Sequence, residues 1–315
     1  MTSSEKDRDQ YQNEIGLTKR NIDDMIAGAA ISETAPSAAE IWYGHSMLTS
    51  ILFPATPAEA RENDGYVSRQ IGHYEYILEA GIDPENKDRQ LPYGKYPRLL
   101  MAWMAKRIRV AGKKADEYVN PEFCTITIPS ISKLAEELGV GKGGTTLKEL
   151  NEHIKRMMLS YISIHQVTGF AEGQRHEVLK VPFARAATYR QEKNAGDDSF
   201  AIMLDPEVFR RLGTETAPFD TRASKALLSG RSVMAYDIYI WLVGTLHNMK
   251  NPLTFNWTWL KEHFGTSIKD ERNFRQKFRT AIKRVQAVYP EAKFAISTKK
   301  GITLFPSVSA IAPRQ

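Results

Sequence analysis

The sequence predicts a mainly helical α+β fold in which two compact units follow one another along the chain. Its 315 residues are enough for two domains of ordinary size, each with its own core. The order helix, strand, helix, turn, helix, hairpin occurs twice, over residues 91–204 and 232–308. The two stretches share little sequence identity, so this internal repeat is one of pattern.

The first unit starts at a turn-rich stretch, PYGKYP, followed by a helix with an apolar face and basic ends. A strand comes next, and then a helix that Ser130 or Ser132 can cap and Gly139 ends. A glycine-rich turn leads to a longer helix with an inward apolar stripe. The expected elements are helices at 99–108, 133–138 and 147–161, a strand at 123–128, a wing hairpin of strands 162–167 and 177–183, and a second strand pair that ends at Leu204.

The second unit opens with a strongly apolar helix and a shorter helix that ends at Gly265. A basic helix follows, which Pro290 stops, and then a hairpin with Lys-Lys-Gly as its turn. The expected elements are helices at 234–249, 254–264 and 271–289 and a hairpin at 292–305. This is the element order of a winged helix-turn-helix, so the sequence predicts two tandem winged-helix domains with β-hairpin wings.

The remaining segments complete the expected division of the chain. Residues 1–40 are polar and acidic, and we expect a flexible, partly disordered N-terminal segment. Residues 41–90 form an N-terminal extension of unclear structure, with enough β-branched and aromatic residues for a strand or two. Residues 205–231 are the connecting segment, in which 221–228 could be helical, and 309–315 are a tail.

Charge is distributed unevenly behind a net charge of +6. Residues 1–90 hold 8 Lys and Arg against 16 Asp and Glu, whereas residues 231–315 hold 14 against 5. A basic second unit behind an acidic start points to a polyanion as the partner of that unit.

The basic helix carries the strongest functional signal. At about 100° per residue, its aromatic and aliphatic side chains fall on one side. Four cations at spacings of three, four and four residues form a separate row, the cationic ridge, which consists of Arg272, Arg275, Arg279 and Lys283. A helix anchored by aromatics with cations turned outward suits the major groove of duplex DNA.

Each cation of the second unit has an expected role. Arg275 and Arg279 are assigned to base reading, because Arg to guanine is the commonest specific contact. Phosphate contacts fix position and make affinity dependent on salt. Phosphate contacts are assigned to the two ends of the ridge, Arg272 and Lys283, and to the turn of the hairpin, Lys299 and Lys300.

The equivalent helix of the first unit is less basic. We expect Lys148, Asn151 and Lys155 on its outward face as further DNA contacts, although Glu149 and Glu152 lie nearby.

For several other side chains of the second unit we expect no contact with DNA or leave the role open. Lys277 and Arg284 lie off the ridge and should be solvated, Trp241 and Trp257 should be core residues, and Trp259 could be either core or a platform for base stacking.

No enzyme, cofactor or metal site is predicted. The stretch GVGKGGT fails as a phosphate loop, because Glu136 stands where the first glycine is needed and Lys142 is followed by glycine. The seven histidines form no closely spaced pair of the kind that a metal-dependent DNA-nicking enzyme uses. Cys124 is the sole cysteine, which excludes an internal disulfide, and its apolar surroundings predict a buried structural thiol.

The expected compartment is the cytoplasm. No apolar run approaches the length of a membrane span, so no membrane association is expected. The opening residues, MTSSEKDRDQ, do not have the pattern of a signal peptide.

Five stretches carry a resemblance to a known family. They are PYGKYPRLLMAW, DTRASKALLSGRSVMAYDIYIWL, FNWTWLKEHFG, FRQKFRTAIKRVQAVYPEA and GITLFPS. In this order they resemble the RepA-type plasmid replication initiators of bacteria, over residues 91–308. The resemblance implies tandem winged helices that bind iterons, the repeated sites of a plasmid origin, and help to load the host replication machinery.

Two classes of function follow. The leading hypothesis is a non-enzymatic initiator that binds directly repeated double-stranded DNA sites, promotes origin opening and takes part in plasmid copy control. The alternative is a winged-helix transcriptional repressor, or an initiator whose dimer represses its own gene. The resemblance further implies a homodimer in free solution, a host initiator ATPase and replicative helicase as partners, and a place on the plasmid or nucleoid of the bacterial cytoplasm.

Overall fold

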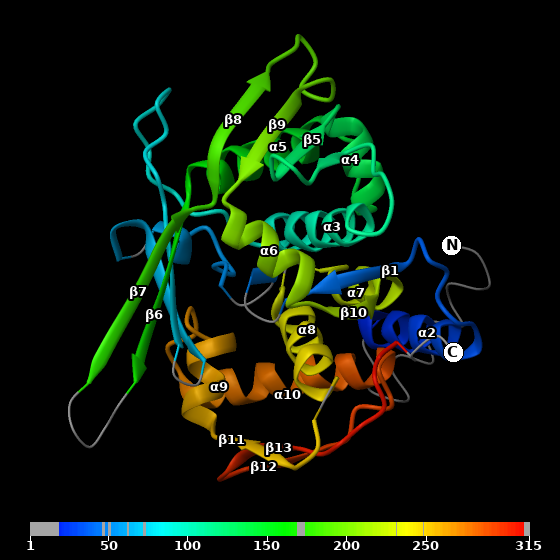
Figure 1. Cartoon of the computed structure of the whole chain (residues 1–315). Coiled ribbons are helices and arrows are strands. Elements are labelled where there is room, and N and C mark those ends of the chain that lie inside the picture. The colour runs from blue at the N-terminus through cyan, green and yellow to red at the C-terminus, as the bar shows by residue number, and fades with distance from the viewer. Residues whose placement is uncertain are drawn as a thin grey trace.

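The protein has a mixed α+β fold with antiparallel sheets (Figure 1). The computed structural model describes residues 19–45, 48–49, 52–61, 63–71, 74–168, 174–230, 232–247 and 249–311. The start of the N-terminal segment that the sequence predicts to be flexible, residues 1–18, lies outside the described residues.

The elements follow in chain order. The α-helices are α2 (Lys19–Glu33), α3 (Lys95–Ala111), α4 (Ile131–Leu138), α5 (Gly144–Leu159), α6 (Pro206–Thr214), α7 (Thr221–Leu227), α8 (Met234–Leu246), α9 (Trp257–Phe264) and α10 (Glu271–Val288), and two 3-10 turns are η2 (Glu59–Arg61) and η3 (Asn63–Gly65). The strands are β1 (Ile41–Gly44), β2 (Tyr66–Ile71), β3 (Tyr74–Glu79), β4 (Val119–Asn120), β5 (Thr125–Ile128), β6 (Tyr161–Thr168), β7 (Arg175–Pro182), β8 (Ala184–Arg190), β9 (Ser199–Leu204), β10 (Ala217–Asp220), β11 (Leu253–Phe255), β12 (Phe294–Ser297) and β13 (Gly301–Leu304).

The second unit closes around a small sheet in the order β11-β13-β12. Helix α8 precedes β11, helices α9 and α10 follow it, and β12 and β13 form the final hairpin. The expected helix at 254–264 starts later, because Thr254 belongs to β11 and the Asn256 side chain accepts a hydrogen bond from the Trp259 backbone as the N-cap of α9.

The first unit repeats this arrangement with different strands. Its sheet has the order β4-β5-β9-β8. Strand β5, which precedes the helix pair, therefore pairs with the last strand, β9, as β11 pairs with β13. Helices α4 and α5 connect β5 to the rest, as α9 and α10 do in the second unit. Ser130, not Ser132, caps α4, and Gly139 ends it in the left-handed conformation with φ 67° that glycine adopts without strain.

The hairpin that the sequence assigns as the wing of the first unit belongs to another sheet. Strand β6 pairs with β3 on one side and β7 on the other, in the order β2-β3-β6-β7. The hairpin that pairs with β5 is β8–β9. The prediction was wrong because β6 and β7 form a long ribbon inserted between α5 and β8, and the strand that pairs with it lies about 90 residues earlier (Figure 1).

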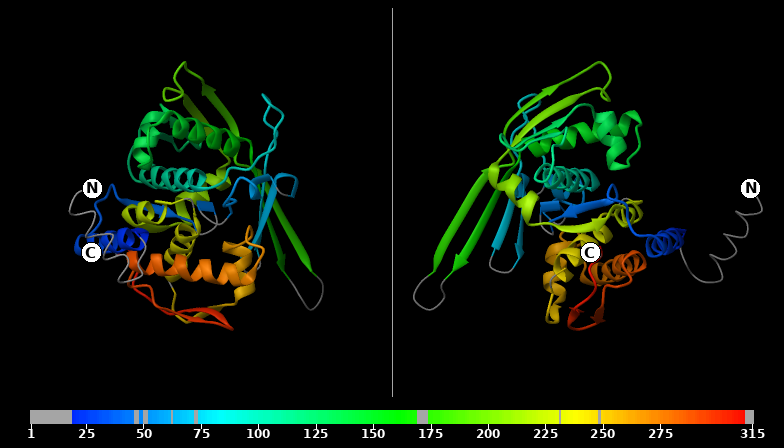
Figure 2. Two further views of the ribbon diagram at one scale, coloured as in Figure 1. Left: turned by 180° about the vertical axis from the view of Figure 1, so that it is seen from behind. Right: turned by 45° about the vertical axis from the view of Figure 1, so that its right-hand side comes forward.

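The two units stand one above the other in every view, and N-terminal segments join them (Figure 2). Strand β1 pairs with β10, which lies in the expected connecting segment, and α7 forms the helix expected there. Helix α2 packs against α7 and α10. The buried apolar side chains of both units belong to one continuous cluster. The domain boundaries proposed from the sequence stay a prediction.

A buried ion pair connects the opening helices of the two units. Arg98 of α3 binds both carboxylate oxygens of Asp237 of α8, at 2.6 and 2.7 Å. Its guanidinium also donates to the backbone carbonyls of Phe53, Pro54 and Gly94. One side chain therefore connects the N-terminal extension and both units. Among the described residues, no helix is both long and apolar enough to cross a membrane.

Candidate nucleic-acid interface

Helix α10 is fixed in the second unit by its apolar face. Phe274, Phe278, Ile282 and Val285 are buried, and the Asp270 side chain accepts a hydrogen bond from the Asn273 backbone as the N-cap. The carboxylate at this end also suits the helix dipole. The opposite side of the helix is thereby turned outward, as its spacing predicts.

The cationic ridge lies along the outward side of α10 and faces the wing. Arg272 and Lys283 are exposed, and Arg275 and Arg279 are half-buried. The ridge, together with Thr298 of the wing turn, lines an open groove between helix and hairpin, whose lining residues are Asp270, Glu271, Arg272, Arg275, Gln276, Arg279, Thr280, Lys283 and Thr298. Lys299 and Lys300 are exposed at the turn beside it.

The two central arginines are ordered by contacts within the unit. Arg275 Nη2 lies 3.0 Å from Glu271 Oε2, and its Nη1 donates to the Thr298 carbonyl at 3.5 Å. The guanidinium carbons of Arg275 and Arg279 lie 5.4 and 5.6 Å from the ring centroid of Trp257. Both cations are therefore held by one aromatic ring.

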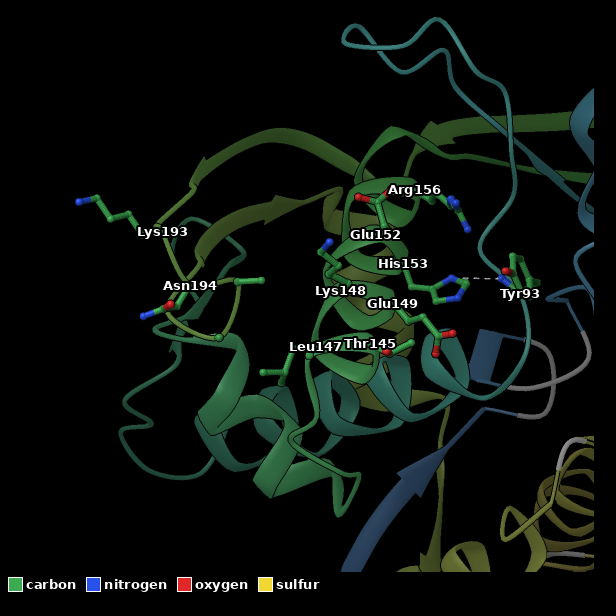
Figure 3. Close-up of a pocket in the computed structure, with 13 residues that line it drawn as sticks. Tyr93, Thr145, Leu147, Lys148, Glu149, Glu152, His153, Arg156, Lys193 and Asn194 are labelled. Atoms are coloured by element: carbon green, nitrogen blue, oxygen red, sulfur yellow. Dashed lines mark hydrogen bonds between the residues drawn. The ribbon is translucent and has the colours of Figure 1, made fainter.

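The first unit has a groove in the matching place, between α5 and the loop of the β8–β9 hairpin (Figure 3). Four residues of α5 with spacings of three, four and four line it, as in the cationic ridge: Thr145, Lys148, Glu152 and Arg156. Lys193 and Asn194 of the hairpin loop also line it, although the Lys193 side chain extends away from α5 (Figure 3). The row has two cations and one carboxylate, and Glu149 lies beside it, so its charge is far weaker than that of α10.

Of the three residues predicted to contact DNA from the first unit, only Lys148 lies in this groove. Asn151 is buried and its amide donates to Asp198. The Lys155 side chain is 12% exposed, with Nζ 3.6 Å from Glu85 and 5.0 Å from the Tyr189 ring centroid. The expectation that Asn151 and Lys155 face outward was wrong. Helical spacing already places Asn151 on the apolar stripe, four residues after Leu147.

In the second unit, Arg284 differs most from what the sequence predicts. We expected a solvated side chain, but Arg284 is 6% exposed and pairs with Asp24 of α2 at 2.5 and 2.9 Å. It also donates to the carbonyls of Ala226 and Leu227 at the end of α7. A buried arginine needs such partners, and they come from segments far away in the sequence. Lys277, in contrast, is exposed as expected.

The tryptophans lie mainly in the core. Trp241 and Trp257 are buried, which confirms the expectation. Trp259 is half-buried and stacks on His263, with 3.7 Å between the ring centroids, inside a cluster that includes Phe255. Its ring is thus occupied by neighbours of its own unit, which favours the core alternative.

Two titratable side chains of the first unit, His153 in the groove and Cys124 before β5, have shifted pKa values. Burial, with a smaller contribution from Arg156, lowers the pKa of His153 to about 3, and its Nδ1 lies 3.5 Å from the Tyr93 backbone N–H. His153 is therefore neutral in the folded protein. Its ring points to the Tyr93 backbone, from which it accepts a hydrogen bond (Figure 3). Cys124 is half-exposed in the turn before β5, with φ 50°, so the expected full burial was wrong; desolvation still raises the pKa of its thiol. Across the described parts of the chain, no three His, Cys, Asp or Glu side chains are grouped to hold a metal ion.

Comparison with known proteins gives one family and two solved structures. A family model described as plasmid-encoded RepA protein matches residues 91–259. Two crystal structures of domains 2 and 3 of RctB are similar at 11% sequence identity; both matches cover 82% of this chain, with 96% and 95% of the other chain and TM-scores of 0.49 and 0.47. The search of curated proteins gives no match.

Proposed function

Because the chain belongs to the family of plasmid-encoded RepA proteins, we propose that it is a replication initiator that binds repeated duplex sites in a plasmid origin. In this proposal binding promotes origin opening and the recruitment of host replication machinery. One observation carries the DNA-binding part: the four cations of the ridge line one open groove, and two more are exposed on the wing turn beside it. Such an arrangement attracts a polyanion and has the shape to enter a major groove.

The repeated topology supports a tandem winged-helix architecture. In each unit an opening helix, a strand, two helices and a hairpin follow one another, and the hairpin pairs with that strand in the same order. This order is β11-β13-β12 in the second unit and β5-β9-β8, with β4 added at the edge, in the first. We identify β12–β13 as the wing of the second unit and β8–β9 as the wing of the first. Each wing lies beside the second helix of its pair, so both units present a helix and a wing to one groove.

The side chains divide into base-reading and phosphate-binding groups. Arg275 and Arg279, at the centre of the groove, are proposed to reach base edges. Phosphate contacts are proposed for residues at its margins, which are Arg272, Lys283, Lys299 and Lys300. In the first unit Lys148 keeps its proposed role. Asn151 and Lys155 support the fold of that unit through Asp198 and Glu85.

The proposed protein is not an enzyme and uses no cofactor. It acts in the bacterial cytoplasm as a dimer when free and binds a single repeat as a monomer, with a host initiator ATPase and replicative helicase as partners. The second candidate is a winged-helix repressor, favoured by the same groove, since any duplex-reading regulator would present it.

Footprinting on the DNA beside the gene tests the proposal. The expected result is protection that repeats at helical-turn spacing, and loss of plasmid maintenance when the ridge is removed. A single protected site at the promoter, with maintenance intact, would support the repressor instead. Incubation of a supercoiled origin with the protein and Mg²⁺ or Mn²⁺ should leave it unnicked, and a nicked product would show an endonuclease.

A further inference from the structure

Trp257 connects the three parts of the second unit that surround the groove. It is the first residue of α9, it is 5% exposed, and its ring packs edge-on against Phe274 and Phe278 of α10. The indole Nε1 donates to the carbonyls of Ser297 and Thr298 at 3.0 and 3.1 Å. The same ring therefore fixes the position of α10 and of the wing turn.

Besides the two phenylalanines, the same ring contacts the two arginines. Arg275 and Arg279 stand one helical turn apart, and their guanidinium groups lie at nearly equal distances from the indole centroid. Within the described residues, Arg279 makes no hydrogen bond or ion pair. A cation–π contact does not use the N–H groups, which lie in the plane of the guanidinium. In Arg275 two of these groups point to Glu271 and to the Thr298 carbonyl, on the helix and on the wing turn.

We propose that Trp257 is a positioning residue that presets Arg275 and Arg279 for base reading and fixes them relative to the wing. The inference rests on the proposed DNA-binding function and deepens it. A free arginine samples many rotamers, and ordering it on binding lowers affinity. An arginine already held by a rigid ring loses less freedom, and its fork can match one base in one orientation. Trp257 would therefore contribute to discrimination between sequences without touching DNA.

A purely structural role for Trp257 is the competing explanation. In that case replacement would disturb α10 as a whole and would weaken binding to every duplex equally. The two explanations differ in whether the effect of the replacement requires the arginines, and a double-mutant cycle measures this dependence.

The test uses Trp257→Phe in the full chain, with Trp241→Phe as the matched control. Phenylalanine keeps an aromatic ring against α10 but removes the indole N–H and reduces the attraction for cations. Trp241 is equally buried in the same unit, and its ring contacts are to Phe255, Trp259 and Phe264. The probes are a duplex of the origin repeat found by footprinting and a scrambled duplex of the same composition, at fixed salt.

Trp257→Phe should lower the ratio of repeat to scrambled affinity about three- to tenfold, with little change in the salt slope. In a protein that already carries Arg275→Ala and Arg279→Ala, the same substitution should change the ratio no further. Trp241→Phe should leave the ratio as in the wild type. The inference would be overturned if Trp257→Phe lowered the affinity for both duplexes equally. It would also be overturned if the substitution changed the affinity ratio just as much in the protein without the two arginines.

Two measurements distinguish a failure of this inference from a failure of the variant to fold and from a failure of the proposed function. Should Trp257→Phe fail to fold, NMR of the wild type decides. The Nε–H protons of Arg275 and Arg279 should be shifted upfield by the indole ring current, and unshifted resonances would refute the contact between the arginines and the ring. If the wild-type protein binds the repeat and the scrambled duplex with equal affinity, the proposed function itself is wrong.

Discussion

Replacement of Arg98 by methionine should be among the most destabilising single changes in the protein. Arg98 is 1% exposed, and its five hydrogen bonds reach Asp237 and the backbone carbonyls of Phe53, Pro54 and Gly94, the residue before α3. Methionine keeps most of the aliphatic length but leaves the Asp237 carboxylate buried without a counter-charge. The loss of one partner from a buried pair costs about 3–5 kcal/mol.

The unpaired carboxylate should make the loss depend on pH. Burial already raises the pKa of Asp237 in the wild type, although Arg98 opposes this. Without Arg98 the pKa rises further, and the folded state then holds a proton that the unfolded chain has released. Stability of the variant should therefore fall as pH rises from the unfolded pKa of about 3.9 towards neutrality. The deficit relative to wild type should be largest near pH 7 and smaller near pH 4.

Urea denaturation followed by circular dichroism measures this deficit. Arg109→Met is the matched control, because Arg109 lies on the same helix but is only half-buried, and its loss should cost about 1 kcal/mol or less. A double variant, Arg98→Met with Asp237→Leu, should recover much of the stability, since it removes both charges. If Arg98→Met costs no more than Arg109→Met at neutral pH, the ion pair does not hold the two units together as the geometry indicates.

Four further outcomes follow from the same structure. Arg275→Ala and Arg279→Ala should each cost about 1–3 kcal/mol of affinity for the repeat duplex and relax preference at one base position, as read by competition binding. Lys300→Ala should weaken binding to all duplexes alike and lower the salt slope by about one, as seen in a salt titration. Arg284→Met should cost about 3–5 kcal/mol in urea denaturation, because Asp24 is left buried and unpaired. Wild-type stability should fall as pH drops from about 6.5 towards 3, and His153→Gln should remove about 1.4 kcal/mol per pH unit of that slope, because His153 stays neutral in the folded state.

The sequence predicts local structure well where the cause is local. Helix α10 ends within one residue of its expected limit, because Asp270 and Pro290 act on the adjacent backbone. The final hairpin and the cap of α4 at Ser130 are confirmed for the same reason. The predicted α+β class is confirmed, but the fold is mixed where the sequence predicts a mainly helical one, because the sheets include strands that the sequence analysis did not assign.

Contacts between distant segments could not be predicted in this way. Arg284 is charged, and a charged side chain on a helix is expected to be solvated. It lies three residues after Ala281 and four before Val288, which places it beside the apolar stripe, and this spacing is the one local indication that it is buried. Its partner, Asp24, is 260 residues away, and no pattern in either segment names the other. Strand β6 likewise pairs with β3 because of the overall topology, which a scan for nearby hairpins does not reveal.

The two grooves together suggest a division of labour between the units. Both place a row of four side chains, at spacings of three, four and four, opposite the turn of a hairpin. In α10 all four are cations, whereas in α5 the row is Thr145, Lys148, Glu152 and Arg156. Counterion release scales with the number of phosphates neutralised, so the second unit should dominate the salt-dependent affinity. A carboxylate such as Glu152 repels phosphates but can accept a hydrogen bond from cytosine, so the first unit is suited to contribute selectivity with little affinity of its own.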